Sequence, residues 1–237
     1  PLDIADLDVC DLDSRVLTLR QLADFVAGCV QHYRPADGAM LRVHQWNPSA
    51  GNQPEPDYPS LRAALDRAAP HNPVELLGND AHHSAFNSAA LALARDGTGR
   101  AVGYSKSTLA GVFAGYRGLV GVDEVGEPNG AVNEDARYAI DPHGMLYNEL
   151  DAVLRSPEKV PERLNRAGIT AAMDAMAMPD GLAVYDRLLR SGRMSVRMTL
   201  AQFYDPSHSR KADGSVDYDR LVARASAVRA RYAGNPL

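Results

Sequence analysis

The order of the predicted elements in the last third of the chain constrains the fold more than any other feature. The pattern there predicts alternating elements, with helices over 156–168, 180–192 and 217–234 and strands over 169–176 and 194–203. Helices and strands that alternate through short links are typical of parallel β/α units. A parallel sheet needs cover on both faces, and two strands alone cannot bury these helices. This part of the chain therefore predicts a section of a larger sheet or barrel.

The pattern changes near Pro142, and the residues before it predict a mixed set of shorter elements. We expect helices over 18–33, 61–69 and from about 87 to 97, and strands over 40–46 and 73–80. Thr18 is the expected N-cap of the first helix, and Gln21 would complete a capping box. The glycine-rich residues 98–134 predict loops and brief strands, with a turn over 124–130.

Composition and charge exclude several classes of function. The chain has 237 residues, of which 45% are hydrophobic, so it can build a sizeable core. Its net charge of -5 gives no reason to expect nucleic acid or an anionic membrane as a partner. No apolar run is long enough to span a bilayer. Two cysteines, Cys10 and Cys29, cannot form a disulfide framework for a chain of this size. A cytoplasmic location is the default expectation, and an exported protein that has lost its leader is the alternative.

The most distinctive polar stretch is GNDAHHSAFNSAAL, residues 78–91. Asp80 precedes the adjacent His82 and His83, and Asn87 and Ser88 are residues that satisfy free backbone donors at a helix start. His82 is either a packing or capping residue or a substrate contact, and Asp80 either orients His82 or belongs to the turn. Neighbouring histidines rarely converge on one ion without further partners, so we do not interpret the pair as metal ligands.

Four motifs, in order, resemble amidohydrolase family 3, the YtcJ-like amidohydrolases related to N-substituted formamide deformylase. They are NDAHHSAFNSAAL, GEPNGAVNEDA, LNRAGITAAMDA and YDRLLRSGRMSVRM, which start at residues 79, 126, 164 and 185. The residues that match the family pattern are Asp80, His82, Asn87, Ser88, Gly126, Pro128, Gly130, Glu134, Gly168, Ile169 and Thr170. Asn129 stands where the family usually has threonine, and HQWNP around Trp46 is similar to a further family segment.

The resemblance implies an α/β fold that is part of a TIM (β/α)8 barrel of the metal-dependent hydrolase type, with a large α/β insertion after strand 1. Residues 1–150 would be the insertion subdomain. Residues 151–237 would be the barrel segment with strands 2 and 3. Because the chain opens at Pro1 and stops at GNPL, where another strand is expected, we interpret it as a section of a longer barrel.

The implied activity is hydrolysis of a C–N bond in an amide, formamide or cyclic amide by metal-activated water. In such enzymes a His-x-His pair on strand 1, a lysine on strand 4, histidines on strands 5 and 6 and an aspartate on strand 8 hold the divalent metal, most often zinc. None of the seven histidines here forms a His-x-His pair. We therefore expect this chain alone to bind no metal and to be inactive, and we assign it no catalytic residue.

Five residues are candidates for substrate binding by resemblance: His82, Asp80, Trp46, Glu134 and Asp174. The simpler readings are a solvated carboxylate for Glu134, a core side chain for Trp46 and a structural strand residue for Asp174. The expected partners are a small-molecule amide and the remaining barrel segments or a companion chain, with a homodimer possible and neither nucleic acid nor membrane expected. The rival hypothesis is a stand-alone, non-catalytic binding or structural protein derived from the barrel, which would be a stable monomer or symmetric oligomer.

Overall fold

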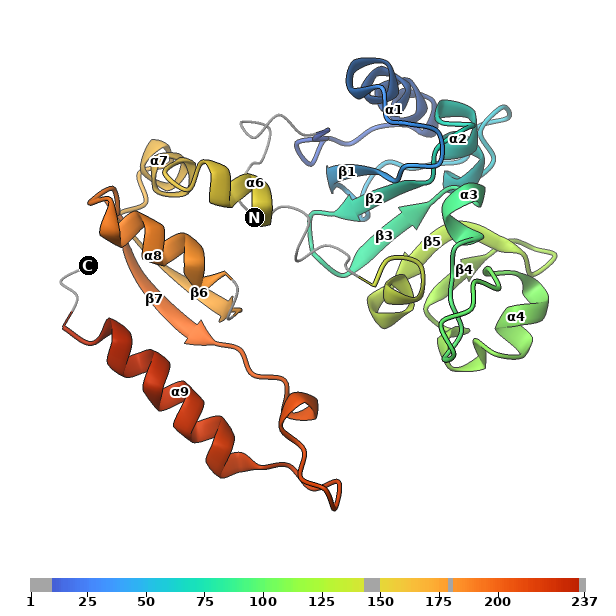
Figure 1. Ribbon diagram of the computed structural model, residues 1–237. Coiled ribbons are helices and arrows are strands. Elements are labelled where there is room, and N and C mark those ends of the chain that lie inside the picture. The colour runs from blue at the N-terminus through green and yellow to red at the C-terminus, as the bar shows by residue number, and fades with distance from the viewer. Residues whose placement is uncertain (1–9, 143–149, 179–180, 235–237) are drawn as a thin grey trace. The chain divides into compact units, whose positions relative to one another are not determined.

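The computed structural model describes residues 10–142, 150–178 and 181–234 (Figure 1). The chain divides into two compact units, the first over Asp3–Glu149 and the second over Leu150–Leu237. Each unit has its own sheet and its own buried core. None of the helices in the described ranges is long and apolar enough to cross a membrane.

The first unit contains a five-stranded mixed sheet in the order β1-β2-β3-β5-β4. Its strands are β1 (Leu41–Trp46), β2 (Val74–Gly78), β3 (His83–Phe86), β4 (Val120–Val122) and β5 (Pro128–Asn133). The pair β1–β2 is parallel, and the other three pairs are antiparallel. The predicted strands over 40–46 and 73–80 are thus confirmed, and β2 and β3 form a hairpin.

Two helices, α1 (Leu19–Tyr33) and α2 (Leu61–Ala68), pack on one face of this sheet. The hydroxyl of Thr18 accepts from the amide of Gln21, whose side chain accepts from the Thr18 amide, so the predicted capping box is confirmed. The buried side chains of this core include Leu19, Leu22, Val26, Val43, Leu65, Val74 and Leu76. Their burial in one cluster fixes the helices against β1 and β2.

The helix predicted over 87–97 is wrong in length. The structure has the strand β3 before it and only a short α3 (Ser88–Leu91), for which Asn87 is the N-cap as expected. Asn87 is buried, and its Oδ1 accepts from the amides of Ala90 and Val74 at 3.0 and 2.9 Å. The helix stops because the carbonyls that would continue it accept from the loop residues Val102–Tyr104 instead.

The glycine-rich part of the first unit contains a short helix that the sequence did not predict, α4 (Lys106–Ala110), ahead of the β4–β5 hairpin. The predicted turn over 124–130 is confirmed in its first part, and its last three residues belong to β5, which begins at Pro128. Gly130 has φ +109°, and a Cβ there would lie 2.6 Å from the amide nitrogen of Arg62. Glycine is therefore required where β5 passes the start of α2.

The second unit has two parallel strands, β6 (Ala171–Ala177) and β7 (Arg197–Gln202). Its helices are α6 (Leu150–Arg155), α7 (Lys159–Arg166), α8 (Leu182–Arg190) and α9 (Tyr218–Tyr232). Every strand and helix predicted for this part is present, and α6 is an addition. The side chain of Asp217 accepts from the amide of Arg220 and so caps α9.

The two faces of the β6–β7 sheet differ sharply in exposure. Met198, Leu200 and Gln202 of β7 line a cavity together with residues of α8 and α9, so both helices lie on the same face. On the other face alternate residues of both strands are exposed, and Met173 is 65% exposed. Parallel strands are normally covered on both faces, so this exposure is unusual.

Cys10 and Cys29 form a disulfide that joins the segment before α1 to the last turn of that helix. This pairing was not predicted from the sequence, because a separation of 19 residues does not reveal whether two side chains meet. Disulfides are rare in reducing compartments. The cytoplasmic location therefore stays a prediction, and the disulfide weighs against it.

Candidate functional site

The candidate site lies at one end of the sheet in the first unit, where the β2–β3 turn meets the end of β5. His83 is paired with Asn133 in the antiparallel register of β3 and β5. The amide of Glu134, the next residue, donates to the carbonyl of His82 at 2.9 Å. The register therefore brings the Asp80–His83 turn beside Glu134, although 52 residues separate His82 from Glu134.

The imidazole of His82 contacts the carboxylate of Glu134. Its Nδ1 lies 3.0 Å from Oε1 and 3.2 Å from Oε2. The two side chains are 63% and 52% exposed, so water screens the pair and its contribution to stability is small. The imidazole and carboxylate are thus open to a ligand and oriented with respect to each other.

The neighbouring His83 makes an analogous contact with Asp80, whose Oδ2 lies 2.6 Å from Nδ1. Asp80 also closes the turn, because its Oδ1 accepts from the backbone amides of His82 and His83. Partial burial disfavours the charged form of Asp80, but the hydrogen bonds from His82 and His83 prevail and hold its pKa below the usual range. Asp80 is therefore a structural carboxylate that stays ionised at neutral pH.

The backbone at this site adopts a conformation that L-residues seldom take. Ala81 has φ +66° and Glu134 has φ +49°. Positive φ at residues other than glycine costs free energy and persists only where the surroundings enforce it.

The other two predicted site residues lie elsewhere. Trp46 is buried at the end of β1, and its indole N–H donates to Oδ1 of Asn52 at 2.9 Å. Its carbonyl accepts from Asn79 at the start of the candidate turn, so its link to the site is through the backbone. Asp174 belongs to the second unit, on β6, and accepts a hydrogen bond from the hydroxyl of Tyr185 at 2.9 Å. Burial, together with the charge of Asp174, raises the pKa of Tyr185.

A buried polar cluster in the first unit was missed by the sequence analysis. Glu75 of β2 is 1% exposed, and its Oε1 accepts from the hydroxyl of Ser84 at 3.3 Å. Nε of Arg42 lies 3.9 Å from the other oxygen of Glu75 and 3.0 Å from Oδ2 of Asp141. Burial and the charge of Asp141 raise the pKa of Glu75 to about 7, against the opposing effect of Arg42. The strand pattern gave no signal, because buried strands are expected to be apolar.

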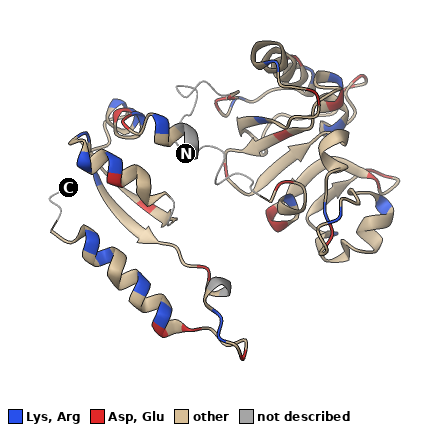
Figure 2. Cartoon of the chain, viewed as in Figure 1, with Lys and Arg blue, Asp and Glu red and all other residues tan. Residues whose placement is uncertain are grey.

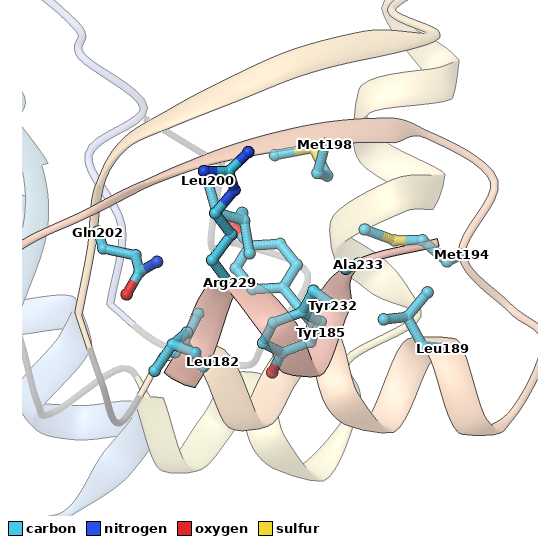
Figure 3. Close-up of a pocket in the computed structure, with 11 residues that line it drawn as sticks. Leu182, Tyr185, Leu189, Met194, Met198, Leu200, Gln202, Arg229, Tyr232 and Ala233 are labelled. Atoms are coloured by element: carbon cyan, nitrogen blue, oxygen red, sulfur yellow. The ribbon is translucent and has the colours of Figure 1, made fainter. Parts of the chain in front are cut away.

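The second unit contains a cavity of about 380 Å³ between α8, β7 and α9 (Figure 3). Its lining is mostly apolar, and its polar groups belong to Gln202, Arg229 and the tyrosines Tyr185 and Tyr232. Several basic residues lie along α9, as Figure 2 shows. The hydroxyl of Tyr232 donates to Asp186 of α8 at 2.6 Å, and Arg231 pairs with the same carboxylate. The cavity can hold an apolar group but has no side chain arranged for bond cleavage.

The described part of the chain offers no group of three or more histidine, cysteine, aspartate or glutamate residues placed to hold a metal ion. At the candidate site the Nδ1 atoms of both His82 and His83 already contact carboxylates. A catalytic zinc usually has three protein ligands. These residues therefore do not fit a metal centre by themselves, and they can position, accept from or donate to a bound molecule.

Three comparisons relate the chain to known proteins. The chain is similar to an uncharacterized metal-dependent hydrolase from Pyrococcus horikoshii OT3, with 13% identity and a TM-score of 0.42 over 83% of this chain and 33% of that one. A second uncharacterized metal-dependent hydrolase, from Pyrococcus furiosus, has 17% identity and a TM-score of 0.42 over 84% of this chain and 34% of its own length. The chain thus spans about a third of each of these proteins. No curated protein matches it. The sequence model of the amidohydrolase family matches residues 6–232, and the chain therefore belongs to the amidohydrolase family.

Proposed function

We propose that this chain is a section of a metal-dependent amidohydrolase that hydrolyses the C–N bond of an amide, formamide or cyclic amide. The observation that carries the proposal is the meeting of Asp80, His82 and Glu134, which come from two separate sequence motifs, at one sheet end. Polar side chains that converge from distant parts of a sequence onto an exposed rim are typical of a ligand site.

In this proposal the second unit is a segment of a (β/α)8 barrel. Two features support it: α8 and α9 lie on the same face of the β6–β7 sheet, and the opposite face is exposed. A doubly wound sheet carries helices on both faces, whereas a barrel carries them outside and packs the inner faces of its strands together. The first unit would then be the insertion that follows strand 1.

The share of this chain in the reaction would be to enclose and orient the substrate. His82 is the exposed group best placed to contact it, and Glu134 and Asp80 hold the turn that presents it. The divalent metal that the family implies, for which zinc is our proposal, would be bound by residues outside the described ranges. The remaining barrel strands, in the same polypeptide or in a companion chain, would supply them.

The test compares amide hydrolysis by the 237-residue chain alone with hydrolysis by a protein that also carries the remaining barrel strands. We expect amine release from N-substituted formamides or amides only in the complete protein, and less than one equivalent of zinc in this chain alone. His82→Gln in the complete protein should lower kcat/KM by roughly 10-fold or more, because a positioned hydrogen bond to the substrate is lost. Ser88→Ala, at the exposed start of α3 beyond β3, is the control.

Two results would count against this function. A complete protein that hydrolyses esters or phosphates but no C–N bond would contradict the substrate class. A chain that is a stable, symmetric oligomer, with the β6–β7 face covered by its own copy and no hydrolase activity in any context, would favour the non-catalytic alternative instead.

A further inference from the structure

We propose that Glu134 is a positioning residue that holds His82 in one tautomer, with its proton on Nδ1, so that Nε2 accepts a hydrogen bond from the N–H group of an amide substrate. The inference deepens the proposed function and rests on it for the identity of the substrate. It adds a chemical preference, because the site would favour amides that carry an N–H group over fully N-alkylated amides.

The contact between Glu134 and His82 determines which ring nitrogen of His82 carries the proton. An ionised carboxylate can only accept hydrogen bonds. Since both oxygens of Glu134 lie within 3.2 Å of Nδ1 of His82, that nitrogen must carry the proton. In a neutral imidazole the second nitrogen is then an acceptor. The contact therefore leaves Nε2 as an acceptor on a side chain that is 63% exposed.

Backbone hydrogen bonds hold the His82–Glu134 pair in place. The Glu134 amide donates to the His82 carbonyl, while the His82 amide donates to Asp80, so the backbone is fixed on both sides of the imidazole. Ala81 and Glu134 keep positive φ values within this arrangement. Strain of this kind persists where neighbouring contacts over-determine the backbone, and it is often found at ligand sites. The side-chain pair is thus built on a rigid rim.

The neighbouring His83–Asp80 pair differs from the His82–Glu134 pair in the role of its carboxylate. His83 and Asp80 make a similar contact, but the other oxygen of Asp80 is committed to two backbone amides of the turn. Asp80 therefore has a role in local structure that any substitution would disturb. Among the described residues, no backbone amide donates to the carboxylate of Glu134, which contacts the His82 ring instead. The carboxylate can therefore be altered without opening the turn. The chain thus offers His83 as an internal control.

An acceptor at Nε2 has a consequence for substrate choice. A site built to accept an N–H hydrogen bond leaves its acceptor unpaired when the substrate lacks that group, and such a mismatch discriminates strongly. We expect kcat/KM for a secondary amide to exceed that for its N-methylated tertiary analogue by roughly 10- to 100-fold. Replacing His82 by leucine should bring the ratio of the two kcat/KM values close to 1, because the acceptor that distinguishes the two amides is lost.

The experiment has one arm that needs no activity. In the 237-residue chain at pH 9, where imidazoles are neutral, the 15N chemical shifts of the His82 ring report which nitrogen is protonated. We expect Nδ1–H in the wild type and a shift toward Nε2–H in Glu134→Ala, which removes the acceptor. His83→Gln should leave the His82 signals unchanged.

The second arm measures kcat/KM in a protein with the complete barrel. Glu134→Ala should lower the ratio of kcat/KM for the secondary amide to kcat/KM for the tertiary amide toward 1, because the protonation of the His82 ring is no longer fixed. An Nε2–H tautomer in the wild type, or equal losses on both amides, would overturn the inference. If the complete protein hydrolyses no amide, both the proposed function and the predicted preference for N–H amides fail. The NMR measurement still decides whether Glu134 sets the tautomer of His82. Tight zinc binding that requires His82 would assign its Nε2 to a metal and would also overturn the inference.

Discussion

Replacing the buried Glu75 by glutamine should change how the stability of the first unit depends on pH. Burial on β2 and the charge of Asp141 raise the pKa of Glu75 from 4.5 to about 7. Above pH 4.5 the unfolded chain releases this proton, whereas the folded chain keeps it until about pH 7. The folded state therefore binds more protons across this window, and the stability that Glu75 contributes is lost as pH rises through it.

The magnitude follows from the two pKa values. A difference between 4.5 and about 7, at 1.36 kcal/mol for each pKa unit, corresponds to roughly 3 kcal/mol. Glutamine has nearly the same volume and stays neutral at every pH, so Glu75→Gln resembles the protonated form. The variant and the wild type should have similar stability at pH 4, and the variant should be more stable by roughly 3 kcal/mol at pH 8.

Urea unfolding at several pH values between 4 and 8 measures this difference. Trp46 is the single tryptophan and lies in the core of the first unit, so its fluorescence reports on that unit. Glu124→Gln is the matched control, because Glu124 is an exposed glutamate in the β4–β5 turn. A stability difference between Glu75→Gln and wild type that is constant from pH 4 to pH 8 would refute the reasoning.

Two further substitutions test the first unit. Cys29→Ser should lower its free energy of unfolding by about 3 kcal/mol, because the disulfide to Cys10 closes a loop with a sequence separation of 19 and restricts the unfolded chain; thiol counting on protein purified without reductant measures the bond directly, and an unchanged stability with two free thiols would contradict the pairing. Asn87→Ala should cost roughly 3 kcal/mol in urea unfolding, since it leaves the buried amides of Val74 and Ala90 without an acceptor. Ser88→Ala, at the exposed neighbouring position, is the control, and an equal cost at both positions would be inconsistent with this account.

The local elements were predictable where the sequence carries both a periodic pattern and an end signal. The first helix has apolar residues at helical spacing and Thr18 and Gln21 at its start, and the structure reproduces both. The last helix is similar, with its start at Asp217. These signals act within a few residues, so no tertiary information is needed to interpret them.

Predictions failed where contacts distant in sequence decide the outcome. No strand was predicted over residues 83–86, yet their pairing with β2 and β5 makes them the strand β3. Glu75 lies among apolar residues of a central strand, and its pKa depends on Arg42 and Asp141, which are far apart in the sequence. Tertiary packing overrides local propensity in both cases, and the sequence pattern of a single segment does not reveal it.

At the candidate site, too, the sequence motifs predicted some features, and contacts between distant residues decided others. The motifs identified Asp80, His82 and Glu134 as residues of interest, and the hypothesis that Asp80 orients His82 came from their closeness in sequence. In the structure Asp80 accepts from the backbone of His82 and from the ring of His83, while the ring of His82 contacts Glu134. The His82 ring contacts Glu134 and not Asp80 because the antiparallel register of β3 and β5 places Glu134 beside the turn. A sequence motif can therefore name the groups of a site, but the strand register determines which carboxylate orients which histidine.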